Sequence, residues 1–166
     1  MKVIDQSLLA QVQAQAASRP RGRANHNLHP ELEDPVQRLL NAMEPGTYVR
    51  PHRHLTPPRW ELFLALSGSA AVLTFDGQGR VRHRHELAPD GPERGVEIPA
   101  GAWHTVVALA PGTVLFEVKQ GPYVAPSDKG FAAWAPAEGE AGAAELERWL
   151  RHAGPGERWR ADDTDR

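Results

Sequence analysis

Two stretches decide how this sequence folds: Gly46-Thr-Tyr-Val-Arg-Pro-His52-Arg-His54, which leads on to Glu61 and Gly68, and Pro99-Ala-Gly101-Ala-Trp-His104. Residues two apart on a β-strand project from the same face, so His52 and His54 point toward one place. Glu61 and His104 each open a later apolar run, and strand parity lets both side chains share that interior face. The spacing therefore predicts three imidazoles and one carboxylate around a single point.

Such a group of side chains is typical of a metal centre. Imidazole nitrogen and carboxylate oxygen suit Zn, Fe(II), Mn, Ni or Co, and leave one or two positions for water or substrate. The chain has no cysteine, which excludes thiolate sites, iron–sulfur clusters and disulfides. We predict that one divalent metal ion is bound by His52, His54, Glu61 and His104. Two other roles are open for Glu61. It could form a hydrogen bond that orients a ligand, or it could be the catalytic group that moves a proton.

The sequence around these motifs is organised as short strands. From residue 46 to residue 119, apolar or alternating runs are separated by turn residues such as Asp76-Gly77 and Pro111-Gly112. Antiparallel strands this short predict a sandwich or a barrel. We expect about seven of them, at 47–53, 61–66, 69–75, 80–87, 95–98, 104–109 and 113–119.

Helices are expected on both sides of the strands. Residues 5–17 place apolar side chains on one helical face, and Asp34-Pro35 has the capping pattern of a second helix that stops at Pro45-Gly46. A third helix is expected at 143–152. We therefore divide one domain into three parts. These are N-terminal helices with a polar connecting segment that pack on the barrel (1–45), the barrel itself (46–136), and a C-terminal helix with a loose tail (137–166).

Charge and hydropathy narrow the class of partner. The chain of 166 residues has 19 basic and 21 acidic side chains, a net charge of −2, which argues against nucleic acid as the partner. No apolar run approaches the ~20 residues that cross a bilayer. We expect a cytoplasmic protein that acts on a small molecule.

Several polar residues are candidates for substrate binding. The irregular segment 18–29 is rich in arginine and amide side chains, which suit phosphate, carboxylate or sugar hydroxyls if the segment covers a polar cavity instead of staying solvated. The candidates are Asn25, Asn27, His29, Tyr48, Arg50, Lys119 and Tyr123. A second His-x-His pair, His83 and His85, stands among charged residues, and we interpret it as part of a solvent-side strand.

The two opening motifs resemble the cupin signature. The first departs from it in having six residues between His54 and Glu61, and in the second Ala108 replaces an asparagine and Gly95 lies closer to Pro99 than the signature has it. The resemblance implies a mainly β, single-domain double-stranded β-helix, the cupin jelly-roll barrel. A closer resemblance, to the WbuC-type cupin fold metalloproteins, is carried by the stretches 23–29, 36–54, 95–104, 115–123, 128–129 and 134–136. It implies a small bacterial cytoplasmic metalloprotein, sometimes encoded among polysaccharide genes, with no assigned reaction.

Four functional hypotheses remain open at this point. The first is an enzyme whose metal polarises an oxygen of a small polar substrate, with carbohydrate or a nucleotide-linked sugar suggested by the resemblance. The others are a metal-independent sugar-nucleotide epimerase or isomerase, a non-catalytic ligand-binding module, and an Fe(II) dioxygenase. Because barrels of this kind commonly pair through open sheet edges, we expect a homodimer.

Overall fold

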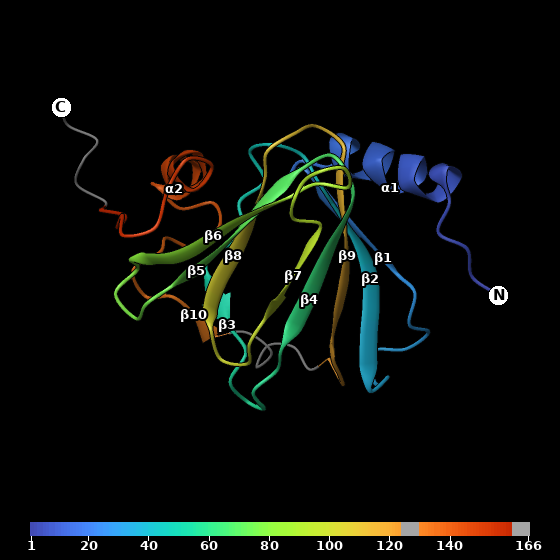
Figure 1. Ribbon diagram of the computed structural model, residues 1–166, viewed down its shortest axis with the longest axis horizontal. Helices are drawn as coiled ribbons and strands as arrows, with labels where there is room; N and C mark the ends of the chain where they lie inside the picture. Colours follow the sequence, from blue (N-terminus) through green and yellow to red (C-terminus); the bar gives the residue numbers. More distant parts are fainter. Residues whose placement is uncertain (124–129, 161–166) are drawn as a thin grey trace.

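The described residues, 1–123 and 130–160 of the computed structural model, form two five-stranded antiparallel sheets with a helix at each end of the chain (Figure 1). The first sheet has, in spatial order, β1 (Arg23–Asn27), β2 (Val36–Met43), β9 (Thr113–Gln120), β4 (Glu61–Ser67) and β7 (Gly95–Ile98). The second has β10 (Gly130–Phe131), β3 (His52–Arg53), β8 (Trp103–Ala108), β5 (Ala70–Phe75) and β6 (Val81–Leu87).

An apolar core lies between the two sheets. Phe63 and Leu115 of the first sheet are packed in one buried cluster with Val72 and Val106 of the second. Strands β4, β5 and β8 give alternate residues to this core, such as Ala70 and Val72 or Val106 and Ala108, as the period of two requires. The seven strands predicted from sequence are confirmed, although only His52–Arg53 of the expected run 47–53 pairs as a strand.

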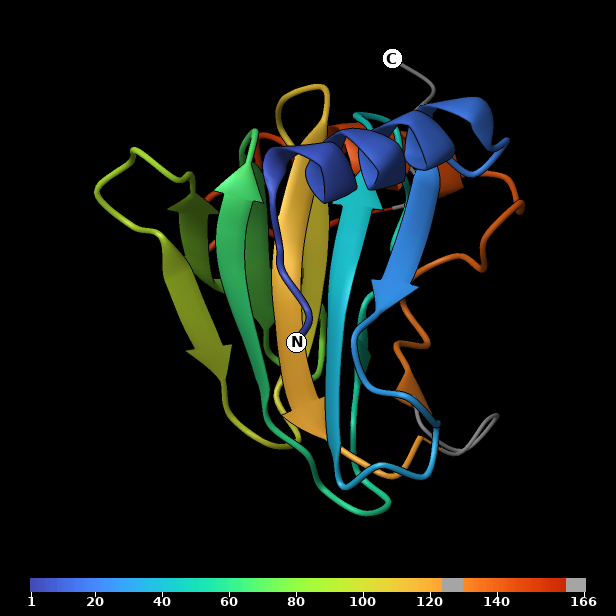
Figure 2. The same cartoon turned by 90° about the vertical axis from the view of Figure 1, so that its right-hand side faces the viewer.

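The helices cover the outer faces of the sheets. Helix α1 (Gln6–Ser18) begins at Asp5, whose carboxylate accepts a hydrogen bond from Leu8 N–H, and it buries Val12 and Ala16 against the first sheet (Figure 2). Helix α2 (Ala143–Leu150) packs its apolar stripe into a separate cluster with the outer face of the second sheet. Both helices confirm predictions from sequence. In the described part of the chain, neither is long and apolar enough to cross a membrane.

The second predicted helix is wrong, because residues 36–43 form strand β2. This strand is buried on both faces: Leu39 and Met43 point into the barrel, whereas Leu40 and Ala42 lie beneath α1. Burial on both faces removes the alternation that marks a strand, and the remaining spacing of apolar residues looks helical. The polar connecting segment is also partly a strand, since β1 pairs with β2 along its whole length.

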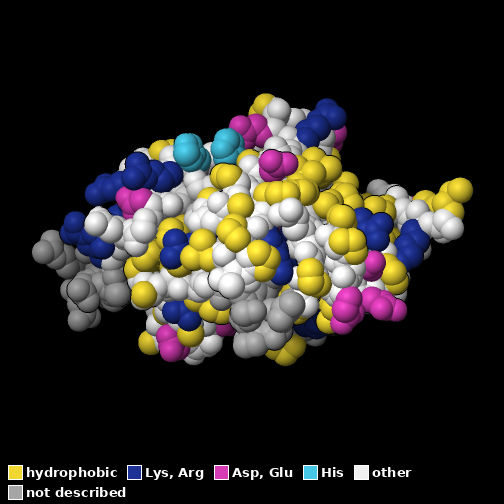
Figure 3. All heavy atoms as spheres, turned by 90° about the horizontal axis from the view of Figure 1, so that it is seen from below, with side chains coloured by type: hydrophobic (Ala, Val, Ile, Leu, Met, Phe, Trp, Pro, Cys, Tyr) yellow, Lys and Arg dark blue, Asp and Glu magenta, His cyan; other side chains and the backbone are white. Residues whose placement is uncertain are grey.

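These corrections change the first part of the predicted three-part division. Residues 23–43 contribute two strands to the sheet and do not merely pack on it. The division otherwise stays a prediction, and residues 161–166 of the predicted loose tail lie outside the described residues. On the face shown in Figure 3, basic, acidic and apolar side chains are interspersed, in keeping with the small net charge.

Candidate metal centre

The structure brings together the four side chains that the two motifs predict. His52, His54, Glu61 and His104 are all buried, with 1–4 % of their surface exposed, and each offers one ligand atom within 4.8 Å of the others. The Glu61 carboxylate lies between two imidazoles, with Oε1 2.9 Å from His54 Nε2 and Oε2 3.0 Å from His104 Nε2. The ring centroids of His52 and His104 are 4.4 Å apart.

Strand register explains why residues distant in sequence meet here. His52 of β3 and His104 of β8 are direct cross-strand partners in the second sheet. Glu61 is the first residue of β4 in the facing sheet, where it pairs with Lys119 of β9. Two sheets therefore supply the two halves of the site across the barrel interior.

The donor set fits a divalent metal ion. The Nδ1 atoms of His52 and His104 are 2.9 and 2.8 Å from the backbone carbonyls of Arg50 and Ala102. A carbonyl only accepts, so each Nδ1 carries a proton and each Nε2 presents its lone pair to the cluster. The lone pair of His104 Nε2 then faces a carboxylate oxygen, and the two need a proton or a cation between them. Two ligands about 2.1 Å from one ion and at right angles would be roughly 3 Å apart, as these are.

Glu61 is held in its charged form. Burial alone would raise its pKa, but the neighbouring imidazoles of His104 and His54 and the Lys119 ammonium lower the pKa well below its ordinary value. The charged carboxylate is the form that coordinates metal ions.

Beside the cluster, Lys119 links it to a large polar cavity. Lys119 Nζ lies 3.5 Å from Glu61 Oε1 and 3.4 Å from Glu117 Oε1, and Glu117 in turn accepts a hydrogen bond from Asn41 Nδ2 at 3.2 Å. Lys119, Glu117 and Asn41 all line a cavity of about 910 Å³ on the inner side of β1, β2 and β9. This volume is in the range of small-molecule sites.

Six of the seven predicted substrate-binding residues line this cavity: Asn25, Asn27, His29, Arg50, Lys119 and Tyr123. The seventh, Tyr48, does not. Its ring is buried in the cluster that contains α2, and its hydroxyl donates to the carbonyl of Pro136 at 2.8 Å. Burial raises the Tyr48 pKa, so the hydroxyl stays protonated and acts as a structural donor. Substrate binding by the other six remains a prediction.

Sequence reasoning missed four polar residues of the cavity wall, Gln37, Asn41, Glu117 and Glu138. Of these, Gln37 and Asn41 fall in the segment predicted as a helix. For Glu117 a signal was present, because Thr113, Leu115, Glu117 and Lys119 alternate along one strand and so share a face. Two charged residues on the inner face of a strand indicate a polar interior.

Comparison with solved structures identifies the fold. A cupin superfamily protein (DSY2733) from Desulfitobacterium hafniense DCB-2 is 18 % identical over 72 % of this chain and 93 % of its own, with a TM-score of 0.52. The protein TT1209 from Thermus thermophilus is 22 % identical over 72 % of this chain and 97 % of its own (TM-score 0.51). The DMSP lyase DddQ from Ruegeria pomeroyi DSS-3 is 20 % identical over 70 % of this chain and 54 % of its own (TM-score 0.51). The cupin jelly-roll barrel predicted from the motifs is thereby confirmed.

Within that fold, the chain belongs to the family described as "Domain of unknown function (DUF6016)", which matches residues 4–87, just over half of the sequence. The match includes His52, His54 and Glu61 and ends before His104. No curated protein matches the chain significantly in sequence.

Proposed function

We propose that this protein is a metal-dependent enzyme in which His52, His54, Glu61 and His104 bind one divalent ion and the adjoining cavity binds a small polar substrate. The observation that carries the proposal is the contact between the two parts, since Lys119 lines the cavity and also touches Glu61. A bound Zn, Fe(II), Mn or Ni ion would act as a Lewis acid on a substrate oxygen or on water.

The protein's own groups have separate tasks in this proposal. The backbone carbonyls of Arg50 and Ala102 fix the tautomer and the orientation of two imidazoles. Lys119 positions the Glu61 and Glu117 carboxylates. The apolar cluster beside the site, which includes Phe63 and Val106, keeps bulk water from this side of the centre.

The class of substrate follows from the cavity wall and from the resemblance to WbuC-type cupins. Side chains with amide groups are suited to hydroxyl groups, which favours a carbohydrate or a nucleotide-linked sugar of surface polysaccharide synthesis. In this proposal the contacts come from Asn25, Asn27, His29, Arg50, Lys119 and Tyr123.

The test begins with the metal and ends with turnover. Protein purified without chelator is analysed for metal, stripped, and reloaded separately with Zn, Fe(II), Mn and Ni. Each form is incubated with a metabolite extract, and consumed compounds are identified by mass spectrometry. We expect one equivalent of metal and consumption of a compound only by a metal-loaded form. Binding of less than stoichiometric metal by every form would contradict the proposal.

The same measurements separate the alternatives. Turnover that survives complete chelation favours a metal-independent epimerase or isomerase, and tight binding without turnover favours a binding module. Oxygen uptake that depends on Fe(II) identifies a dioxygenase. The variant Glu61→Gln decides the role of the carboxylate: loss of metal makes it a ligand, whereas loss of turnover with metal retained makes it the group that moves a proton.

The predicted homodimer and cytoplasmic location also belong to this proposal. Strands β1, β7, β6 and β10 end the two sheets, and an open edge is a surface on which a second copy can pair. Light scattering coupled to size exclusion measures the mass, for which we expect twice 18.2 kDa.

A further inference from the structure

The cavity beside the metal centre has a strongly positive wall. Five basic side chains line it, against two acidic ones, although the whole chain has a net charge of −2. One of the acidic residues, Glu117, is paired with Lys119. The other, Glu138, lies at the opposite end of the wall, between two arginines. The charge of the wall therefore favours a ligand with a negative group.

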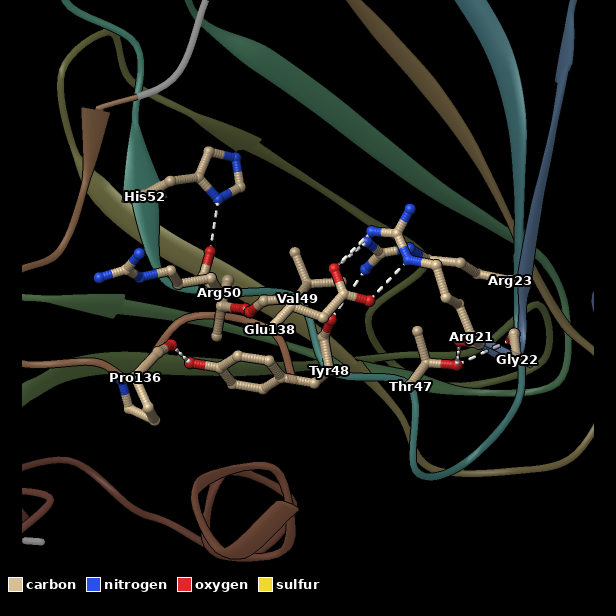
Figure 4. Close-up of polar contacts among 11 residues, drawn as sticks. Arg21, Gly22, Arg23, Thr47, Tyr48, Val49, Arg50, His52, Pro136 and Glu138 are labelled. Carbon is tan, nitrogen blue, oxygen red and sulfur yellow. Dashed lines mark hydrogen bonds and ion pairs between the residues drawn. The ribbon is translucent and has the colours of Figure 1, made fainter. Parts of the chain in front are cut away.

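At that end, Arg21 and Arg23 clasp the Glu138 carboxylate (Figure 4). Arg21 makes a two-pronged contact, with Nε 2.6 Å from Oε1 and the terminal nitrogen on Oε2, while Arg23 donates to Oε2 at 2.9 Å. A guanidinium fork of this kind recognises carboxylate and phosphate alike. Glu138 thus occupies a place built for an anionic group.

The Glu138 side chain is held weakly, but Arg23 and the backbone near Glu138 are anchored. The side chains of Arg21 and Glu138 are 60 % and 39 % exposed, and ion pairs this exposed contribute little. Arg23 also donates to the carbonyl of Tyr48 at 2.8 Å, four residues before His52, and the Tyr48 hydroxyl fixes Pro136. The Glu138 carboxylate can therefore turn toward solvent while Arg23 and the backbone at Pro136 stay in place.

A buried imidazole supplies an independent sign of a ligand in the same cavity. His29 is 5 % exposed, and its Nε2 has no hydrogen-bond partner among the described residues. Its Nδ1 lies 3.1 Å from the Arg38 backbone nitrogen and 2.9 Å from the Arg38 carbonyl oxygen, so Nδ1 has a partner in either tautomer. A buried polar atom without a partner, as Nε2 is, is costly, and a polar group of a ligand would satisfy it as donor or as acceptor.

Between the two ends the wall is neutral and polar. Asn25 of β1 and Asn41 of β2 are direct cross-strand partners, and their side chains line the cavity together with Asn27 and Gln37. Amide groups of this kind donate to and accept from hydroxyls without requiring a charge.

We infer that the cavity takes a polyhydroxylated small molecule with one anionic phosphate or carboxylate group, which Arg21 and Arg23 bind in place of Glu138. The inference rests on the proposed function for the identity of the cavity as the substrate site. It deepens that proposal by naming the class of substrate, a sugar phosphate or a sugar acid, and the end of the cavity that holds its charge.

The test measures binding of glucose 6-phosphate, glucuronate and glucose by calorimetry at low salt, on both metal-loaded and chelator-treated protein. We expect at least one of the two acids to bind more tightly than glucose. Glu138→Gln removes the competing carboxylate and should tighten that binding by about 2- to 5-fold, the worth of an exposed ion pair. Arg21→Ala with Arg23→Ala should weaken it at least about tenfold.

Matched variants separate this effect from net charge and from misfolding. Glu145 and Arg148 form an exposed pair away from the cavity, at 3.4 Å. Glu145→Gln serves as the control for Glu138→Gln, and Arg82→Ala with Arg148→Ala serves as the control for the arginine pair. Neither control should change the affinity by more than about twofold. If the double variant does not fold, Arg21→Ala alone is used, since that side chain is mostly exposed.

The outcomes test the inference separately from the metal. Preference for the phosphate or for the carboxylate names the anionic group. If Glu138→Gln binds both acids no better than glucose, or if the arginine variants bind as the wild type does, the inference is wrong whether or not metal binds. An opposite response to Glu138→Gln and to the arginine variants in chelator-treated protein supports the inference even where the metal proposal fails.

Discussion

The chain contains two His-x-His pairs, and they have opposite surroundings. His52 and His83 stand in one row across the second sheet, since His52 pairs with His104, His104 with Thr74, and Thr74 with His83. Residues in one row point to the same face of a sheet. Yet His52 and His54 are 4 % and 1 % exposed, whereas the side chain of His85 is 38 % exposed.

The difference comes from what lies opposite each pair. His54 Nε2 lies 2.9 Å from the buried carboxylate of Glu61 in the facing sheet. His85 Nδ1 lies 3.1 Å from the carboxylate of Glu93, whose side chain is 46 % exposed. Strand β6 ends its sheet, so its histidines are open to solvent. The predicted exposure of His83 is confirmed, but the cause is an edge position and not an outward face. Within the described residues, the pair His52 and His54 is therefore buried and grouped with Glu61 and His104 closely enough to hold a metal ion, whereas the pair His83 and His85 is open to solvent.

The largest effect is expected from removing the buried pair. His52→Ala with His54→Ala deletes two of the four ligands, so metal affinity should fall at least about 100-fold and bound metal should disappear from purified protein. Elemental analysis and chelator competition measure both quantities. His83→Ala with His85→Ala is the matched control and should keep one equivalent. If His52→Ala with His54→Ala retains all of its metal, the proposed metal centre is wrong.

Metal removal should lower stability by the next largest amount. An ion present at 100 to 1,000 times its Kd stabilises the folded state by about 3–4 kcal/mol. For a chain of this size the midpoint of thermal unfolding should fall by roughly 10 °C when chelator is added. Chelator should lower the midpoint equally in His83→Ala with His85→Ala, and should leave it unchanged in His52→Ala with His54→Ala. If chelator lowers the midpoint equally in both double variants, the stabilising ion is bound elsewhere.

Lys119→Met should lower the free energy of unfolding of the metal-free protein by about 3 kcal/mol. The side chain is 10 % exposed and lies between Glu61 and Glu117, and removing one partner from a buried ion pair leaves charges without compensation. Urea unfolding measures the change. The exposed Arg148→Met, which loses its contact with Glu145, is the comparison and should cost less than about 0.5 kcal/mol. Equal costs would mean that burial does not matter at Lys119.

The sequence was sufficient to predict the four clustered side chains and the exposure of the second histidine pair. The four clustered side chains, His52, His54, Glu61 and His104, were predictable because each lies in or next to a short strand, and strand parity is local information. That the four meet was also predictable, once the cupin resemblance supplied the topology. The exposure of His83 followed from the charged residues around it.

The cavity was less predictable, for two physical reasons. Strand β2 is buried on both faces by α1 and the barrel, so its pattern imitates a helix and conceals Gln37 and Asn41. The contact of Arg21 and Arg23 with Glu138 joins residues more than 100 positions apart, and only the folded chain brings them together. Single-sequence periodicity holds no information about such pairs.

The smallest effect is expected at Thr74, which stands between the two histidine pairs. Its hydroxyl lies 3.0 Å from His83 Nδ1, while its cross-strand neighbour on the other side is His104. Thr74→Val keeps the β-branched shape, so stability should change by about 0.5 kcal/mol or less and metal affinity by less than about twofold. Urea unfolding and chelator competition give the two values. A change in metal affinity of about tenfold or more would show that the edge pair is coupled to the buried one through this row, and that the two histidine pairs do not act separately.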